Sequence, residues 1–87
     1  MGFAWSAQQW RENLDDHGVD FADAALIFAN PVLEAEDDRH DDGEVRLRVL
    51  GHVGEDYSLV VDTWRGEHRR IISAWKGGDN GQRRYQA

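Results

Sequence analysis

The sequence contains no cysteine, a single proline and no long hydrophobic run. Without cysteine the chain can form neither disulfides nor thiolate–metal sites, and nothing indicates an oxidising compartment. No apolar stretch approaches the roughly 20 residues of a membrane span. The N-terminus, MGFAWSAQQW, also lacks the charged-then-apolar pattern of a signal peptide. These absences predict a soluble, cytoplasmic protein.

Positive charge is scarce in the first half of the chain. Residues 1–44 contain twelve carboxylates but only Arg11 and Arg39 as cations, whereas residues 45–87 contain five carboxylates and eight lysines or arginines. The net charge is −7. Because an acidic body repels phosphate at long range, we expect sequence-independent nucleic-acid binding to be disfavoured. A local nucleic-acid site is compatible only with the basic second half.

The composition is that of a folded domain. Hydrophobic residues make up 40% of the 87 residues, and four of the aromatic residues are tryptophan. A chain of this length can bury a modest core but cannot form two domains. We therefore expect one domain over residues 1–87.

Two helices are predicted near the N-terminus. Ser6 and Gln9 fit a capping box, which predicts a helix that ends at about Asp16. Asp20 is the expected cap of a second helix over residues 21–29, which ends before the Asn-Pro pair. Apolar residues at helical spacing predict a buried helix face that includes Phe3, Trp5, Trp10 and Leu14.

Strand patterns follow a charged segment. The start of residues 31–44 predicts an edge strand, and its remainder predicts a charged loop. Residues 44–53 alternate, with Arg46 and Arg48 on one face and apolar residues on the other. Residues 56–64 and 68–75 predict two further strands joined by tight turns. The fold class is therefore α+β: two helices, a three- to four-stranded antiparallel sheet, and a short C-terminal helix or tail.

No metal site is predicted. The chain has four histidines, and their spacing does not match that of zinc ligands; they are His17, His40, His52 and His68. His17 is expected to close the first helix, where an imidazolium interacts favourably with the helix dipole. The acidic segment EAEDDRHDDGE lacks the ligand spacing of a calcium-binding EF-hand loop. We therefore expect neither a metal nor another cofactor.

Several short motifs occur together in a fixed order. They are FAW at residues 3–5, Asn13 with HGV at residues 17–19, the series Phe21, Ala24, Phe28 and Pro31, the series His40, Gly43, Glu44, Arg46 and Gly51, RIISA at residues 70–74, and Tyr85. In this order and spacing, the chain resembles the BrnT family of ribonuclease toxins. The resemblance covers nearly the whole chain. It implies a fold related to the RelE toxins, cleavage of mRNA, and neutralisation by a DNA-binding antitoxin.

The departures from the family pattern affect charged positions. The chain has Gln9 and Asp16 where the family usually has lysine, and Trp75 where it usually has arginine. Gly81 replaces a glutamate that usually precedes the C-terminal tyrosine. Metal-free RNA cleavage needs cations to stabilise charge on the phosphate, together with an acid and a base. If the chain is active, the resemblance implies Arg46, Arg70 and Tyr85 as catalytic residues, with Arg70 as the best phosphate ligand.

Two hypotheses follow for the function. The first is a non-enzymatic inhibitor that mimics nucleic acid and blocks the basic groove of a nucleic-acid-binding protein, such as an anti-CRISPR or another phage anti-defence protein. The alternative is an mRNA-cleaving toxin of a type II toxin–antitoxin system. Under the first hypothesis, the partner-binding residues are Asp15, Asp16, Glu34, Glu36, Asp37, Asp38, Asp41, Asp42, Glu44 and the apolar Trp75.

Overall fold

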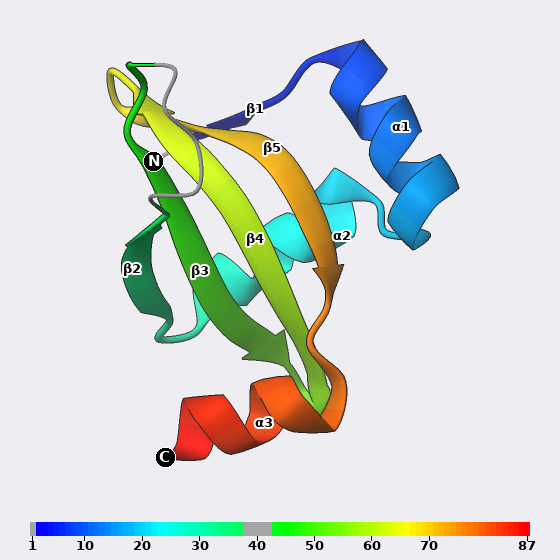
Figure 1. The fold of residues 1–87 in the computed structure, drawn as a ribbon, viewed down its shortest axis with the longest axis vertical. Coiled ribbons are helices and arrows are strands. Elements are labelled where there is room, and N and C mark those ends of the chain that lie inside the picture. Colours follow the sequence, from blue (N-terminus) through cyan, green and yellow to red (C-terminus); the bar gives the residue numbers. More distant parts are fainter. Residues whose placement is uncertain (1, 38–42) are drawn as a thin grey trace.

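The computed structural model describes residues 2–37 and 43–87. These residues form one twisted sheet with three α-helices and one 3₁₀ helix around it (Figure 1). The five strands have the spatial order β1-β5-β4-β3-β2. The elements in chain order are β1 (Gly2–Ala4), α1 (Ala7–His17), α2 (Phe21–Ala24), the 3₁₀ helix η1 (Ala25–Ala29), β2 (Leu33–Asp37), β3 (Arg46–Val53), β4 (Asp56–Arg65), β5 (His68–Lys76) and α3 (Gly78–Gln86). The α+β class and the order of the predicted elements are confirmed. Among the described residues, no helix is long and apolar enough to cross a bilayer.

The sheet has one strand more than the sequence predicts, and it is mixed rather than purely antiparallel. β1 pairs in parallel with β5, with Phe3 opposite Arg69. Phe3 therefore belongs to a strand and not to the apolar face of α1, and its ring packs against Phe28 at 5.3 Å between centroids. The prediction failed because three residues are too few to show the alternation of a strand. Trp5 was also placed wrongly, because it lies outside α1 and is 37% exposed.

Local side-chain caps define α1 as predicted. The Ser6 hydroxyl accepts a hydrogen bond from the Gln9 backbone N–H at 3.0 Å. Gly18 ends the helix in the left-handed conformation, with φ of 68°, and its N–H donates to the Leu14 carbonyl. A glycine adopts this conformation without the penalty of a Cβ atom. The observed end at His17 is one residue beyond the predicted end.

The second predicted helix changes geometry halfway along its length. Asp20 caps α2 by accepting a hydrogen bond from the Ala22 N–H, and the chain tightens into η1 from Ala25 onward. Together the two segments bury the side chains of Phe21 and Ile27 against the sheet. η1 can approach β3 closely because Gly51 has no side chain; an added Cβ atom would lie 2.8 Å from the Cβ of Ile27.

The two faces of the sheet differ in their cover. α2 and η1 lie behind the sheet in Figure 1 and pack on Val49, Val60 and Ile71, which are fully buried. α3 crosses the lower end of β3 and β4, and its Gly81 lies against Leu50. The short C-terminal helix expected from the tail is confirmed. We use the term open face for the side of the sheet opposite α2 and η1.

Candidate functional site

The arginines of β3 and β5 meet on the open face. Val49 packs in the core, so Arg46 and Arg48 point to the opposite side of β3, as predicted. Arg70 on β5 lies opposite Thr63 of β4. Leu47, the residue after Arg46, lies opposite Asp62 of β4, which places Arg46 next to Thr63. Thr63 therefore lies between Arg46 and Arg70. Since neighbouring strands are about 4.8 Å apart, the two arginines are on the order of 10 Å apart along one row.

Two of these arginines have no partner among the described residues. Within the part of the chain that the structure describes, no hydrogen bond or ion pair involves the side chain of Arg48 or Arg70. Arg46 differs, because its Nε lies 3.6 Å from a carboxylate oxygen of Glu44. An arginine without a carboxylate partner keeps its full charge and its hydrogen-bond donors for a ligand. This makes Arg48 and Arg70 the strongest candidates for contact with an anion.

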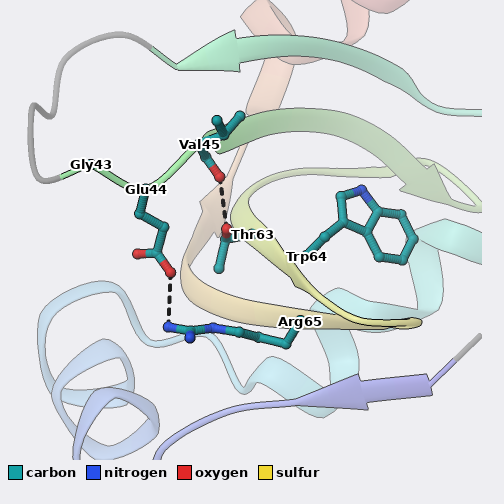
Figure 2. Close-up of a pocket in the computed structure, with 6 residues that line it drawn as sticks. All are labelled: Gly43, Glu44, Val45, Thr63, Trp64 and Arg65. Carbon is teal, nitrogen blue, oxygen red and sulfur yellow. Dashed lines mark hydrogen bonds and ion pairs between the residues drawn. The ribbon is translucent and has the colours of Figure 1, made fainter.

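Glu44 is held by arginines at the end of the sheet. Figure 2 shows its carboxylate facing Arg65, at 2.9 Å, while the Thr63 hydroxyl donates to the Val45 carbonyl at 2.7 Å. These residues line a cavity of about 530 Å³. Since Arg65 and Arg46 both lie next to it, Glu44 is charge-compensated within the protein. The negative charge of Glu44 is therefore not available to bind a partner protein.

Arg69 lies on the helix side of the sheet and is buried. Its guanidinium carbon is 4.5 Å from the centroids of both Phe28 and Trp64. It donates to Asp62, which is fully buried, at 3.0 Å, and also to Glu34. Burial raises the pKa of Asp62, although the hydrogen bond and the charge of Arg69 oppose this shift. This arginine therefore neutralises the buried carboxylate of Asp62, binds the exposed carboxylate of Glu34, and is not available to bind RNA.

Tyr85 is not near Arg70. It lies on α3, where its hydroxyl donates to the Pro31 carbonyl at 2.6 Å and its ring packs against Tyr57 at 5.5 Å. Tyr57 is six residues along β4 from Thr63, which corresponds to about 20 Å of strand. The structure therefore brings Arg46 and Arg70 onto one face but leaves Tyr85 at the far end of the sheet.

The acidic residues predicted to bind a partner lie on separate parts of the fold. Asp15 and Asp16 are on α1, whereas Glu34 and Glu36 are on β2 at the other edge of the sheet. Glu34 is bound to Arg69. Asp37 is buried, and its side chain is not free. The remaining predicted carboxylates, Asp38, Asp41 and Asp42, lie outside the described residues, as does His40. The described carboxylates thus do not form one continuous acidic line.

α1 lies beside the open face at β5. Trp75 is partly buried there, and its ring lies 5.7 Å from that of His17 at the end of α1. His17 lines a small cavity of about 230 Å³ together with Ser73 and Asp16. The imidazole therefore lies between the helix and the arginine-bearing strand. Among the described residues, no group of three or more histidine, aspartate or glutamate side chains could hold a metal ion.

Sequence reasoning missed Arg84 as a residue of this face. Arg84, on α3, lines a cavity of about 180 Å³ together with Arg48 on β3. Its position depends on α3 folding back over β3 and β4, and a glycine-rich tail gives no indication of that packing. The adjacent Arg83–Arg84 pair was the available signal, but the sequence alone does not say which face of the sheet it reaches.

Comparison with known proteins agrees with this architecture. A family model described as the ribonuclease toxin BrnT of type II toxin–antitoxin systems matches residues 5–80. Among solved structures, the chain is similar to the Brucella abortus ribonuclease toxin BrnT, with 24% sequence identity and a TM-score of 0.64, over 87% of this chain and 95% of that one. No curated protein matches the sequence.

The two matches carry different weight. The structural match, at its level of identity, shows a shared fold. The family model spans the strands that bear Arg46, Arg48 and Arg70, and it stops within α3, before Arg84. Since that model covers most of the sequence, the chain belongs to the BrnT family of ribonuclease toxins of type II toxin–antitoxin systems.

Proposed function

We propose that this chain is an active RNA-cleaving toxin and that it holds its substrate on the open face. The observation that carries this proposal is that two arginines on the same side of the sheet, Arg48 and Arg70, have no partner within residues 2–37 and 43–87. Acidic overall charge weakens attraction to RNA at long range, but short-range contacts depend on local charge. Among the described residues of the open face, Arg48 and Arg70 are cations without a carboxylate partner.

Arg70 and Arg46 are the proposed ligands of the scissile phosphate. Cleavage of RNA by its own 2′-OH places extra negative charge on the phosphate oxygens in the transition state. Guanidinium groups fixed on strands stabilise that charge without reorganising. Arg46 is tied to Glu44 and Arg70 is not, so Arg70 is the side chain on which we expect activity to depend most.

His17 is the proposed proton-transferring group. It ends α1 beside Ser73 and Trp75 on β5, the strand that also carries Arg70. An imidazole can act as either acid or base near neutral pH, which both steps of metal-free RNA cleavage require. The family resemblance implies cationic residues on this helix, and here Gln9 and Asp16 occupy two of those positions. In this chain, therefore, the cations come from the strands.

The partner implied by this function is an antitoxin. Membership of a type II toxin–antitoxin family supports a protein that binds and neutralises the toxin, and we expect it to bind DNA as well. An enzyme that cuts mRNA acts in the cytoplasm. The inhibitor hypothesis lacks comparable support, because the described acidic residues lie on opposite edges of the sheet and Glu34 and Glu44 are bound by arginines. We therefore do not propose nucleic-acid mimicry.

Induced expression in bacteria without an antitoxin tests the proposal. We expect growth arrest with fragmented mRNA, and we expect Arg70→Ala to restore growth and intact mRNA. Lys76→Ala is the matched control, because it also removes one cation from β5 but on the opposite face. Normal growth with intact mRNA in cells that contain the folded wild-type protein would refute the proposed activity.

A further inference from the structure

We propose that the cavity between β2, β3, β4 and the end of α3 binds one nucleotide of the RNA strand, next to the nucleotide held at Arg46 and Arg70. This inference rests on the proposed ribonuclease function and adds a second contact point for the substrate. The cavity has a volume of about 180 Å³ and is lined by two arginines, Arg48 and Arg84, which come from different elements.

Arg48 contributes a donor that has no acceptor. Its Nε is buried and makes no hydrogen bond within the described residues. A buried N–H without a partner is unfavourable unless a ligand or water supplies an oxygen. Because the Arg48 side chain has no hydrogen-bond or ion-pair partner among the described residues, a phosphate entering the cavity would pair with its guanidinium and compensate its charge.

Arg84 contributes a second cation on a fixed support. α3 is held by the hydrogen bond from Tyr85 to the Pro31 carbonyl and by the contact of Gly81 with Leu50. Within the described residues, the side chain of Arg84 has no partner. Its neighbour Arg83 instead donates to Asn80 at 2.6 Å. Arg83 is thus hydrogen-bonded within α3, whereas Arg84 has no partner among the described residues and lines the cavity.

The remaining lining favours a nucleotide over a simple anion. Leu33, Leu50 and Leu59 give the cavity an apolar wall, against which a base or ribose can pack. Glu34 also lines the cavity, but its carboxylate binds Arg69, which lies on the helix side of the sheet. Two guanidiniums beside apolar side chains fit a ligand that is charged at one end and flat and weakly polar at the other.

The position of the cavity matches the path of an RNA strand across the open face. Arg48 is two residues from Arg46 along β3, which places their Cα atoms about 7 Å apart. This is close to the separation of successive phosphates in an extended RNA strand. An RNA strand that places one phosphate between Arg46 and Arg70 can therefore place a neighbouring phosphate at Arg48 and Arg84.

Binding of a 2′-O-methyl oligoribonucleotide tests this inference separately from cleavage, because that RNA lacks the 2′-OH nucleophile. Fluorescence anisotropy gives its Kd at several salt concentrations for the wild type, Arg84→Gln and Arg83→Gln. We expect Arg84→Gln to weaken binding roughly tenfold, as loss of a charge-assisted hydrogen bond does. We also expect it to lower the slope of log K against log salt by about 0.7 to 1. Arg83→Gln removes the same charge from the same exposed helix, and we expect less than a twofold change in Kd.

Each outcome has a distinct meaning. Equal effects of the two substitutions would overturn the proposed nucleotide site while leaving the ribonuclease function intact, because charge alone would then explain binding. Wild-type protein that binds this RNA no better than a matched acidic control protein would instead overturn the proposed RNA-binding function itself. A selective loss in Arg84→Gln, with circular dichroism unchanged, would support the site.

Discussion

The side chain of Asn13 pairs with the backbone of Ala74 in both directions. Its amide oxygen accepts from the Ala74 N–H at 3.0 Å, and its amide nitrogen donates to the Ala74 carbonyl at 2.8 Å. The same nitrogen donates to the Val19 carbonyl at 2.9 Å. Beyond the short β1, this asparagine thus takes the place of a neighbouring strand along β5. It fixes α1, and with it His17, at the edge of the open face.

We therefore predict that Asn13→Ala lowers the free energy of unfolding by about 3 kcal/mol. Three buried backbone groups would lose their partners, the N–H and C=O of Ala74 and the C=O of Val19, and each such loss costs about 1–3 kcal/mol. Urea denaturation followed by tryptophan fluorescence measures the change. Asn30→Ala is the control, because Asn30 also donates to a backbone carbonyl but is exposed, and we expect a loss below about 1 kcal/mol there. Similar losses in both variants would contradict the strand-like role of Asn13.

Two adjacent arginines on β5 are predicted to have opposite roles. Arg69→Met leaves the buried carboxylate of Asp62 without its cation, and breaking a buried pair in this way costs about 3–5 kcal/mol. Arg70→Met removes a side chain that has no partner in the described protein, and we expect less than about 1 kcal/mol. Cleavage of a labelled RNA by folded protein should nevertheless be lost in Arg70→Met. Substantial cleavage by that variant would contradict the proposed phosphate ligand.

We predict that the free energy of unfolding depends on pH through the protonation of Asp62. Burial raises its pKa in the folded state, so between the ordinary pKa and the raised value the folded protein binds more protons than the unfolded chain. The stabilisation from the protonated carboxyl is fully present below the ordinary pKa and is lost as pH rises through the folded pKa. Asp62→Asn does not titrate at this position. We expect wild type to lose stability relative to this variant as pH increases over that window.

Urea titrations of both proteins at a series of pH values measure that difference. A wild type that gains stability relative to Asp62→Asn with increasing pH would show that Arg69 outweighs burial and lowers the pKa. Asp79→Asn, an exposed carboxylate on α3, serves as the control and should show no comparable trend.

Tyr85 is predicted to act through stability and not through chemistry. Tyr85→Phe removes the hydrogen bond to Pro31 but keeps the ring packing against Tyr57, so we expect a loss of about 1 kcal/mol. The rate of RNA cleavage at saturating substrate should stay within about twofold of wild type, since the hydroxyl lies far from Arg70. A loss of cleavage on the scale of Arg70→Met, in a variant that is still folded, would restore Tyr85 as a catalytic residue.

His17→Gln tests the proposed proton transfer. A glutamine keeps hydrogen-bonding capacity but cannot titrate, and general acid or base catalysis contributes about 10²- to 10⁴-fold to rates. We expect a fall in cleavage of at least about 10²-fold. His52→Gln is the control and should cleave at the wild-type rate, because the His52 ring packs against Tyr57 and Tyr85 at the far end of the sheet from Arg70. Cleavage by folded His17→Gln at the wild-type rate would rule out this role.

The parts of the fold that sequence reasoning predicted are those with a local physical cause. Ser6 and Asp20 satisfy helix N–H groups within three residues of themselves, and their caps were predicted correctly. The alternation around Arg46 and Arg48 fixed the faces of β3, because successive side chains must point to opposite sides of a strand.

The parts that were missed depend on contacts between distant residues. β1 exists because its backbone pairs with β5, more than sixty residues away, and Gly2–Ala4 alone has no strand pattern. Glu34 looks like a solvated carboxylate in the sequence, yet it reaches Arg69 across the sheet. Arg84 joins the open face only once α3 has packed on Tyr57 and Leu50. Such placements follow from tertiary packing, which local patterns do not encode.

The pairing of β1 with β5 also fixes the order in which the protein can become functional during synthesis. Residues 2–4 leave the ribosome well before their partners, residues 68–70, which are made more than sixty residues later. Contacts of such long range form late and slowly. Arg70 is itself one of those partners, so the proposed RNA-binding face is incomplete on any shorter nascent chain. A toxin built in this way would remain harmless to the ribosome that is translating it until β5 has been made and has left the ribosome.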